Sequence, residues 1–351
     1  MELGLLTLGD HLPDPHTREY AETQAERLAL WVELCVRAER GGFESCWIGE
    51  HHFNDYIVSS PQMLLTAVAV QTERIRLGTA VSLLANRDPV RFAEEFATLD
   101  LLSRGRAEVG LGSGITPHTF ELFGQDPEHA HEIMDEHLEL LKRIWEDERV
   151  DWQGKHRAPL RDARVEPRTY RGGRIPISIA TGSSEEAAVR AGEAGHRLMI
   201  MTVYKRYQDF RTVADRYREA YDKAGHPAED RGVAAVGYVH VRRDGKDAWN
   251  EWKPYVSNYV RFVTRLAKRQ GLSNTLQQVQ RETPQWLDER GRRESDICGN
   301  PQEVIDRLSG LSDALGGLDR FLCYFDVGCL PAGAVRESVD TFCEEVIPKL
   351  R

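Results

Sequence analysis

Two adjacent histidines beside a glutamate, in the run Glu50-His51-His52-Phe53, are suited to proton transfer. An imidazole accepts or delivers a proton near neutral pH, and a neighbouring carboxylate can orient or tune it. Successive side chains of a strand point to opposite faces, so we expect one histidine to be catalytic and the other structural. A zinc site is disfavoured because the pair lacks HExxH spacing. Taken alone, the run also fits ordinary polar residues at a strand end.

A second run, Ala180-Thr181-Gly182-Ser183-Ser184, precedes the helix-like sequence EEAAVRAGEAG. Small residues let a backbone approach an anion, and the free N–H groups at a helix N-terminus bind phosphate. The simpler interpretation is an ordinary helix cap, with Ser184 as N-cap and Ala187 in the first turn. A third run, Gly110-Leu111-Gly112-Ser113-Gly114, would admit a flat ring or a sugar-phosphate, but it lacks GxGxxG spacing.

These runs need a scaffold, and the chain alternates short apolar stretches with longer amphipathic ones. Strand-like runs followed by helix-like runs are typical of β-α units, and eight strand-like runs favour a closed α/β barrel over an open doubly wound sheet. Glu50 to Phe53 then lie at the C-terminal face, where barrel active sites are built. The expected strands are Leu3–Leu8, Ser45–Gly49, Ile75–Val81, Arg106–Leu111, Ile177–Ala180, Arg197–Met201, Val233–Val241 and Phe321–Phe325.

The helix-like runs share an amphipathic pattern, and Pro89 suits the first turn of its helix because its missing N–H has no partner there anyway. The expected helices cover about Glu22–Arg40, Pro89–Ser103, Glu128–Glu146, a stretch from Ser184, Lys205–Lys223, Asp247–Lys268, a stretch after Pro301, and Ala334–Leu350.

The segment Gln270 to Arg293 does not fit this alternation. It is polar, poor in β-branched residues and longer than a usual connection. Two interpretations stay open: a solvated insertion with fragmentary helix, or a lid over the barrel mouth.

Composition excludes several classes of protein. The 351 residues are 41% hydrophobic and carry a formal net charge of −10, without a Lys/Arg cluster of the kind that binds nucleic acid. The six cysteines form no CxxC pair, so neither a zinc site nor a disulfide framework is indicated. The start lacks a basic, then apolar, signal pattern and no run of 18 apolar residues occurs, so we expect a cytoplasmic protein without a membrane span.

Several runs together resemble bacterial luciferase and its relatives, in the same order along the chain. They are Glu50–Phe53, Arg76–Val81, Asp88–Arg106, the glycine-rich run from Gly110, Arg171–Ser184, the GNPQEVIDRL run from Gly299, and the closing helix. The resemblance covers nearly the whole chain. It implies a (β/α)8 TIM barrel, in a single domain over residues 1–351, with a mobile loop at 270–293 between the seventh and eighth units.

The resemblance also implies roles for individual residues. His51 matches the family's catalytic histidine beside the flavin, with Glu50 and His52 as its neighbours. Thr79-Ala80 corresponds to a non-prolyl cis peptide against the flavin ring.

The cofactor phosphate would lie at Thr181 to Ser184 and Ala187. Ala187 replaces a hydroxyl residue of the family, Ser113 stands where luciferase has a phosphate-binding arginine, and Gly112 replaces a cysteine near the flavin. Flavin affinity is therefore expected to be modest.

The activity implied by the resemblance is that of a two-component monooxygenase. Reduced FMN from a separate flavin reductase would react with O₂, and a flavin hydroperoxide would oxygenate a small organic substrate. The substrate cannot be read from the sequence, and light emission is not implied. We expect a homodimer or a heterodimer. Aromatic residues that could line the mouth are Trp47, Phe53, Tyr56, Phe120, Tyr204 and Tyr238.

Two alternatives share the fold. Relatives of this barrel use a deazaflavin for hydride transfer, and luciferase pairs its active subunit with a supporting one that has lost active-site groups and the mobile loop. The EHHF run favours FMN and O₂, and the presence of His51 and of the insertion argues against a non-catalytic partner subunit.

Overall fold

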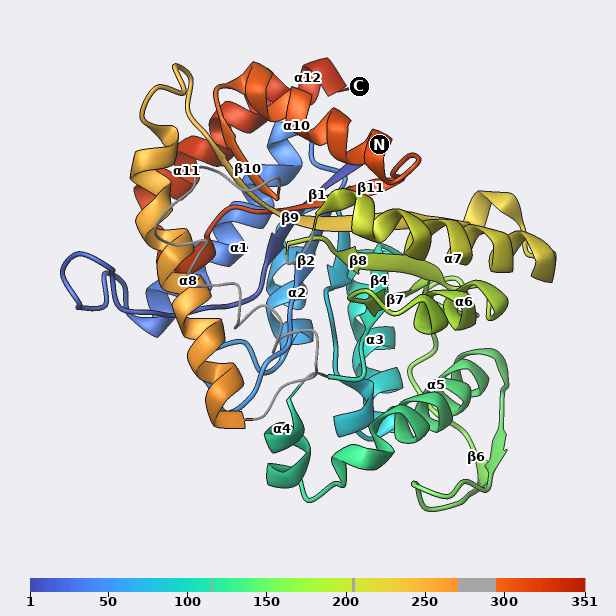
Figure 1. Ribbon diagram of the computed structural model, residues 1–351. Helices are drawn as coiled ribbons and strands as arrows, with labels where there is room; N and C mark the ends of the chain where they lie inside the picture. The colour runs from blue at the N-terminus through green and yellow to red at the C-terminus, as the bar shows by residue number, and fades with distance from the viewer. Residues whose placement is uncertain (115, 204–205, 271–294, 351) are drawn as a thin grey trace.

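The computed structural model describes residues 1–114, 116–203, 206–270 and 295–350. Within these residues eight parallel strands close into a barrel, in the order β9-β11-β1-β2-β3-β4-β7-β8, with β8 pairing back onto β9 (Figure 1). The expected TIM barrel is confirmed. Its strands are β1 (Glu2–Thr7), β2 (Ser45–Ile48), β3 (Arg76–Thr79), β4 (Ala107–Leu111), β7 (Ile177–Thr181), β8 (Arg197–Met201), β9 (Val233–Val241) and β11 (Arg320–Tyr324).

Helices surround the barrel, and three of them begin at caps that the sequence encodes. The side chain of Thr23 caps α1, that of Asp88 caps α3, and that of Asn300 caps α10. The α-helices of the described residues are α1 (Gln24–Gly41), α2 (Pro61–Ala69), α3 (Pro89–Ser103), α4 (Pro117–Leu122), α5 (Ala130–Glu146), α6 (Glu185–Glu193), α7 (Arg211–Ala224), α8 (Ala248–Gln270), α10 (Pro301–Ala314), α11 (Ala332–Thr341) and α12 (Ile347–Leu350).

Several elements differ from the sequence-based expectation. An additional strand, β10 (Asp296–Gly299), pairs with the C-terminal half of β9, and β5 (Val150–Trp152) and β6 (Leu160–Ala163) form a separate antiparallel pair. The helix α2 was not expected from the sequence. The expected closing helix is divided by a π-helical turn at Phe342–Val346 between α11 and α12. The predicted lid at 270–293 lies outside the described residues, apart from Gln270 at the end of α8.

The N-terminal end of the barrel is filled by Trp47 and an ion pair. The indole of Trp47 lies against Gly78, where a Cβ atom would come within 2.3 Å of the ring. The guanidinium of Arg320 lies 4.9 Å from the ring centre and binds both oxygens of Glu108, at 2.6 and 3.1 Å. Trp47 therefore packs toward the end of the barrel opposite to the mouth that it was expected to line.

Three arginines close helix C-termini, where backbone carbonyls lack partners within the helix. Arg106 donates to the carbonyls of Ala69 and Thr72 at the end of α2. In the same way Arg168 donates to carbonyls at the end of α5, and Arg218 to those of Leu315 and Gly317 after α10.

No helix in the described ranges is long and apolar enough to cross a membrane. All six cysteines lie in the described part of the chain, and no disulfide joins any two of them. Among the same residues there is no group of three or more His, Cys, Asp or Glu that could hold a metal ion.

The buried side chain of His196 makes the stability of the folded protein depend on pH in the acidic range. It lies between α6 and β8 and is 6% exposed, and its Nε2 has no hydrogen-bond partner among the described residues. Burial, followed by the charges of Lys142 and Arg174, lowers its pKa from 6.5 to about 4. The unfolded chain therefore binds a proton here below about pH 6.5, whereas the folded chain does so only below about pH 4. The stability associated with the neutral ring is lost as the pH falls through this window.

The substitution His196→Gln removes this titration. We expect the unfolding free energy of the wild type to fall relative to that of the variant by about 1.4 kcal/mol for each pH unit within the window. Guanidinium titrations at several pH values measure the difference, and other titrating groups cancel because both chains contain them. Stability curves that run parallel from neutral to acid pH would contradict the expectation.

Candidate functional site

The loop that carries Glu50 to Phe53 follows β2 at the C-terminal end of the barrel. Its backbone is hydrogen-bonded to the loops after β3 and β1: Glu50 N donates to Val81 O at 3.0 Å, and Ile57 N donates to Gly9 O at 2.8 Å. His51 N donates to Val58 O at 2.9 Å, which closes the loop on itself. These bonds fix the two histidines over the ends of β1, β2 and β3.

The end of β3 contains the expected non-prolyl cis peptide, but one residue further along the chain. The cis bond joins Ala80 to Val81, and the expectation of Thr79-Ala80 was wrong. Ala80 N still donates to Ile48 O of β2 at 3.0 Å, so the backbone keeps its sheet pairing through Ala80. Thr79 is fully buried, and its hydroxyl donates to Gly110 O of β4 at 3.0 Å.

The glycine-rich run after β4 is bound to the same segment. Ser82 N donates to Gly110 O at 2.8 Å, and Gly112 N donates to Ser82 O at 3.2 Å. A Cβ atom at Gly112 would lie 2.8 Å from the side chain of Val81. The structure therefore brings together the ends of β2, β3 and β4, with Gly112 buried and Ser113 half-buried between them.

His51 is held by an aromatic contact. Its ring is stacked on Tyr56, with centroids 3.9 Å apart and an interplanar angle of 16°. Burial, followed by the neighbouring His52, lowers its pKa from 6.5 to about 3. The ring is thus uncharged at neutral pH, with one nitrogen that carries a proton and one that accepts a hydrogen bond.

His52 belongs to a different contact set, centred on Glu50. The Glu50 carboxylate is 2% exposed, and its Oε1 lies 2.9 Å from His52 Nε2. Its other oxygen accepts from Leu83 N at 3.3 Å and lies 3.6 Å from Arg87 Nη1. Glu50 therefore orients His52 and not His51, and Arg87 balances its buried charge. Sequence reasoning did not single out Arg87, although it directly precedes the run Asp88 to Arg106 that carries the resemblance.

The candidate phosphate segment follows β7, the strand next to β4. Thr181 ends β7, and Ser184 caps α6 by accepting from Ala187 N at 3.2 Å. The cap interpretation of Ser184 is thus confirmed, and the Ala187 N–H is already used by it. A Cβ atom at Gly182 would meet nothing within 4 Å. Two exposed carboxylates, Glu185 and Glu186, occupy the first turn of α6.

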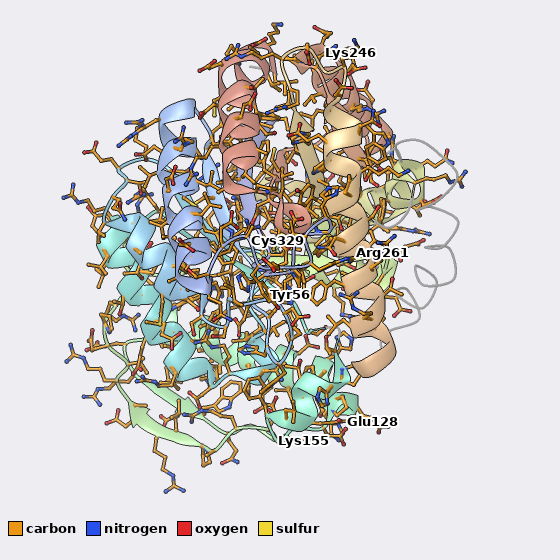
Figure 2. The ribbon with its side chains drawn as sticks, turned by 90° about the vertical axis from the view of Figure 1, so that its left-hand side faces the viewer. Tyr56, Glu128, Lys155, Lys246, Arg261 and Cys329 are labelled. Atoms are coloured by element: carbon orange, nitrogen blue, oxygen red, sulfur yellow. The ribbon has the colours of Figure 1, made fainter. Side chains whose placement is uncertain are left out.

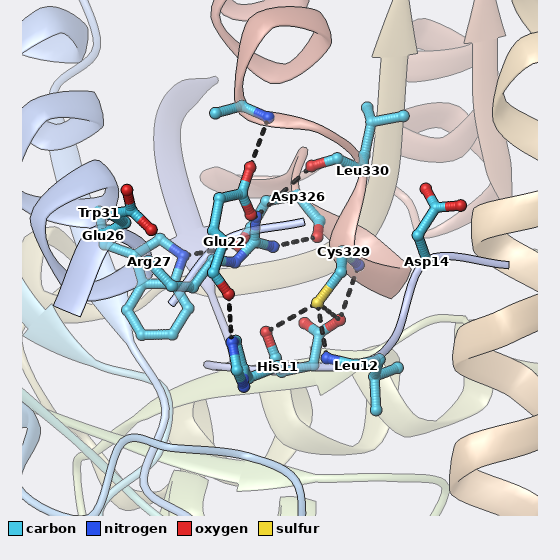
Figure 3. A network of polar contacts seen from close by, with 12 residues as sticks. His11, Leu12, Asp14, Glu22, Glu26, Arg27, Trp31, Asp326, Cys329 and Leu330 are labelled. Atoms are coloured by element: carbon cyan, nitrogen blue, oxygen red, sulfur yellow. Dashed lines mark hydrogen bonds and ion pairs between the residues drawn. The ribbon is translucent and has the colours of Figure 1, made fainter. Parts of the chain in front are cut away.

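A buried charged cluster lies beside the mouth, at the ends of β1 and β11 (Figure 3). Arg27 of α1 is fully buried and donates to Asp326 Oδ2 at 3.0 Å, and Trp31 Nε1 donates to the same oxygen at 2.7 Å. A second buried carboxyl, Asp10, accepts from the Tyr324 hydroxyl. Burial, followed by the charge of Asp326, raises the pKa of Asp10 to about 6.

The family model described as luciferase-like monooxygenase matches residues 1–317. The chain belongs to the luciferase-like monooxygenase family. The resemblance noted in the sequence is thereby confirmed.

Individual relatives and solved structures show how far the similarity extends. The oxygenase component of the flavin-dependent trigonelline monooxygenase of Acinetobacter baylyi is 24% identical over 93% of this chain and 91% of its own. The oxygenating constituent of 3,6-diketocamphane monooxygenase from Pseudomonas putida, in complex with FMN, has a TM-score of 0.80 at 20% identity, over 99% and 98% of the two chains. An F420-dependent secondary alcohol dehydrogenase has a TM-score of 0.75 at 20% identity, over 100% and 99%.

The candidate site is thus assembled in two parts. Backbone hydrogen bonds join the ends of β2, β3 and β4, whereas the segment from Thr181 to Ala187 follows the neighbouring strand β7 at the same barrel end. The catalytic and cofactor-binding roles of these residues stay predictions. Of the aromatic residues expected at the mouth, Tyr204 lies outside the described residues, and Phe120 and Tyr238 are buried.

Proposed function

We propose that this chain is the oxygenase component of a two-component monooxygenase, which takes reduced FMN from a separate reductase and uses O₂ to oxygenate a small organic substrate. The observation that carries the proposal is His51, an uncharged and partly buried imidazole in the loop after β2, whose neighbour Glu50 donates from its N–H to Val81 O at the end of β3. Two similar proteins support this choice of cofactor: the trigonelline enzyme is named as flavin-dependent, and the diketocamphane enzyme is described in complex with FMN.

The residues present fit a flavin phosphate only weakly. The first N–H groups of α6 and the open space at Gly182 suit an anion, whereas Glu185 and Glu186 repel one. Bound FMN would supply the electrons that activate O₂. The protein's part is to enclose the ring, exclude water, and present His51 as a neutral group that accepts or donates a proton.

Weak phosphate binding leads to an expected result for the purified protein. We expect well under one flavin per chain after purification and no NADPH oxidation by this polypeptide alone, because the flavin is to be delivered reduced by a reductase. Absorbance spectra and an NADPH assay check both points. Tightly bound, stoichiometric oxidised FMN would count against the two-component proposal.

The decisive experiment mixes the protein with photoreduced FMN and then with O₂. If the site encloses the flavin, oxidised FMN should reappear more slowly than in a protein-free control, and ¹⁸O from ¹⁸O₂ should enter one of three probe compounds. The probes are decanal, trigonelline and 3,6-diketocamphane, a long-chain aldehyde and the compounds named for two similar enzymes. Reoxidation at the protein-free rate, without labelled product, would sink the proposal.

A second candidate function rests on the similarity to the F420-dependent alcohol dehydrogenase. In that case the same mouth would hold a deazaflavin, and hydride transfer would need no oxygen. Anaerobic titrations with reduced FMN and with reduced F420 distinguish the two: the monooxygenase proposal requires tighter binding of reduced FMN.

A further inference from the structure

The ring of Tyr56 connects His51 to a distant part of the chain. The imidazole of His51 is stacked on the ring of Tyr56, and the ring of Phe262 also contacts Tyr56, with centroids 4.9 Å apart and an interplanar angle of 69°. The Tyr56 hydroxyl lies 2.7 Å from the hydroxyl of Tyr259. Tyr259 and Phe262 both belong to α8, so α8 contacts the residue on which His51 rests. Figure 2 views the molecule from this side, with Tyr56 labelled beside α8.

Helix α8 is itself fixed to the barrel by two further polar contacts. The Tyr255 hydroxyl donates to Asp14 Oδ2 at 3.0 Å, and Asn258 Nδ2 donates to Pro13 O at 2.9 Å. Both acceptors lie in the loop after β1, on the same side of the barrel as α8 (Figure 1). The hydroxyl of Tyr259 is therefore presented to Tyr56 from an anchored helix, and it is only 1% exposed.

Stacking alone leaves an aromatic ring free to slide over its neighbour, whereas a buried hydrogen bond of 2.7 Å fixes both partners. We propose that Tyr259 is a positioning residue for His51 and acts through the hydroxyl of Tyr56. This inference rests on the proposed function for its effect on turnover, but its geometric content is independent of any flavin.

The geometric part is tested by NMR on protein labelled with ¹³C at histidine Cε1, with the His51 signal assigned from its loss in His51→Ala. A proton over an aromatic face is shielded, so loosening of the stack should move the His51 signal downfield in Tyr259→Phe and in Tyr56→Phe. The double variant should show no further movement, because both substitutions remove the same contact. Tyr221→Phe is the matched control: it also removes the hydroxyl of a buried tyrosine, which donates to Pro227 O at 3.1 Å, and it leaves the Tyr56–Tyr259 contact intact.

The functional part measures how fast O₂ reoxidises FMN that was bound in its reduced form. We expect Tyr259→Phe to accelerate this reoxidation about fivefold, the factor expected for one lost hydrogen bond, and Tyr221→Phe to leave it near the wild-type rate. In a His51→Ala background Tyr259→Phe should have no additional effect.

The two parts fail separately. An unmoved His51 signal in Tyr259→Phe, or an equal movement in Tyr221→Phe, overturns the positioning role whatever the kinetics show. If the His51 signal moves but neither Tyr259→Phe nor His51→Ala changes the rate of reoxidation, the positioning contact is supported. The role of His51 in the proposed function is then contradicted.

Discussion

Replacement of His51 by alanine should lower product formation by roughly 10²-fold or more, the usual scale for a lost acid–base group, while reduced FMN still binds. The ring is uncharged at neutral pH and stacks on Tyr56 at the end of β2, so it can exchange a proton with a group in the mouth without first losing one to solvent. Turnover of the probe compound that the wild type oxygenates measures the effect.

The control for this substitution is His131→Ala, at an exposed position of α5. It should retain wild-type turnover, and both variants should unfold at the same denaturant concentration within error. A His51→Ala protein that forms labelled product at the wild-type rate would remove His51 from the reaction.

The largest loss of stability is expected for Arg27→Met, at about 3–5 kcal/mol, because this substitution leaves buried carboxylates without their partner. Arg27 is the guanidinium that faces Asp326, and Asp10 adds a second carboxyl to the same cluster. Burial raises the pKa of Asp326, and the charge of Arg27 opposes that rise. Guanidinium unfolding at neutral pH measures the loss.

Arg37→Met on the same helix is the matched control. Arg37 pairs with Asp340 at 2.8 Å, but both side chains are more than one-third exposed, so its removal should cost at most about 1 kcal/mol. The double variant Arg27→Met/Asp326→Asn should recover part of the loss, since it removes one uncompensated charge. Equal losses for Arg27→Met and Arg37→Met would show that burial of the pair does not decide its energy.

The strands of the barrel were predictable because each is a short apolar run between polar or glycine-containing turns. Asp88-Pro89 and Asn300-Pro301 likewise placed the starts of α3 and α10. In contrast β10 has only four residues and, among the described strands, pairs with β9 alone, so its own sequence carries little signal. The hairpin of β5 and β6 was missed for a related reason, since much of it is exposed and lacks a regular apolar pattern.

The site was predictable in its location but not in its contacts. That Glu50 binds His52, whereas His51 stacks on Tyr56, depends on side-chain directions in an irregular loop, which no periodicity encodes. Tyr56 and Tyr259 are 203 positions apart, so only the closed barrel brings them together. Ser184 was assigned both as a cap and as a phosphate ligand, and a lone sequence cannot separate two uses of the same helix start.

The arginines that bind the C-terminal ends of helices fall into two groups along the chain. In the first half of the chain, Arg106 and Arg168 donate hydrogen bonds to the last carbonyls of α2 and α5. In the second half, Arg218 donates to a carbonyl at the end of α10. Between the halves, Gly172 and Gly173 have positive φ and would meet nothing within 4 Å of an added Cβ. A break there leaves every one of these closures inside its own fragment. The two half-barrels would then rejoin along the strand edges β4–β7 and β1–β11, which makes this glycine pair the natural place to divide the protein for fragment complementation.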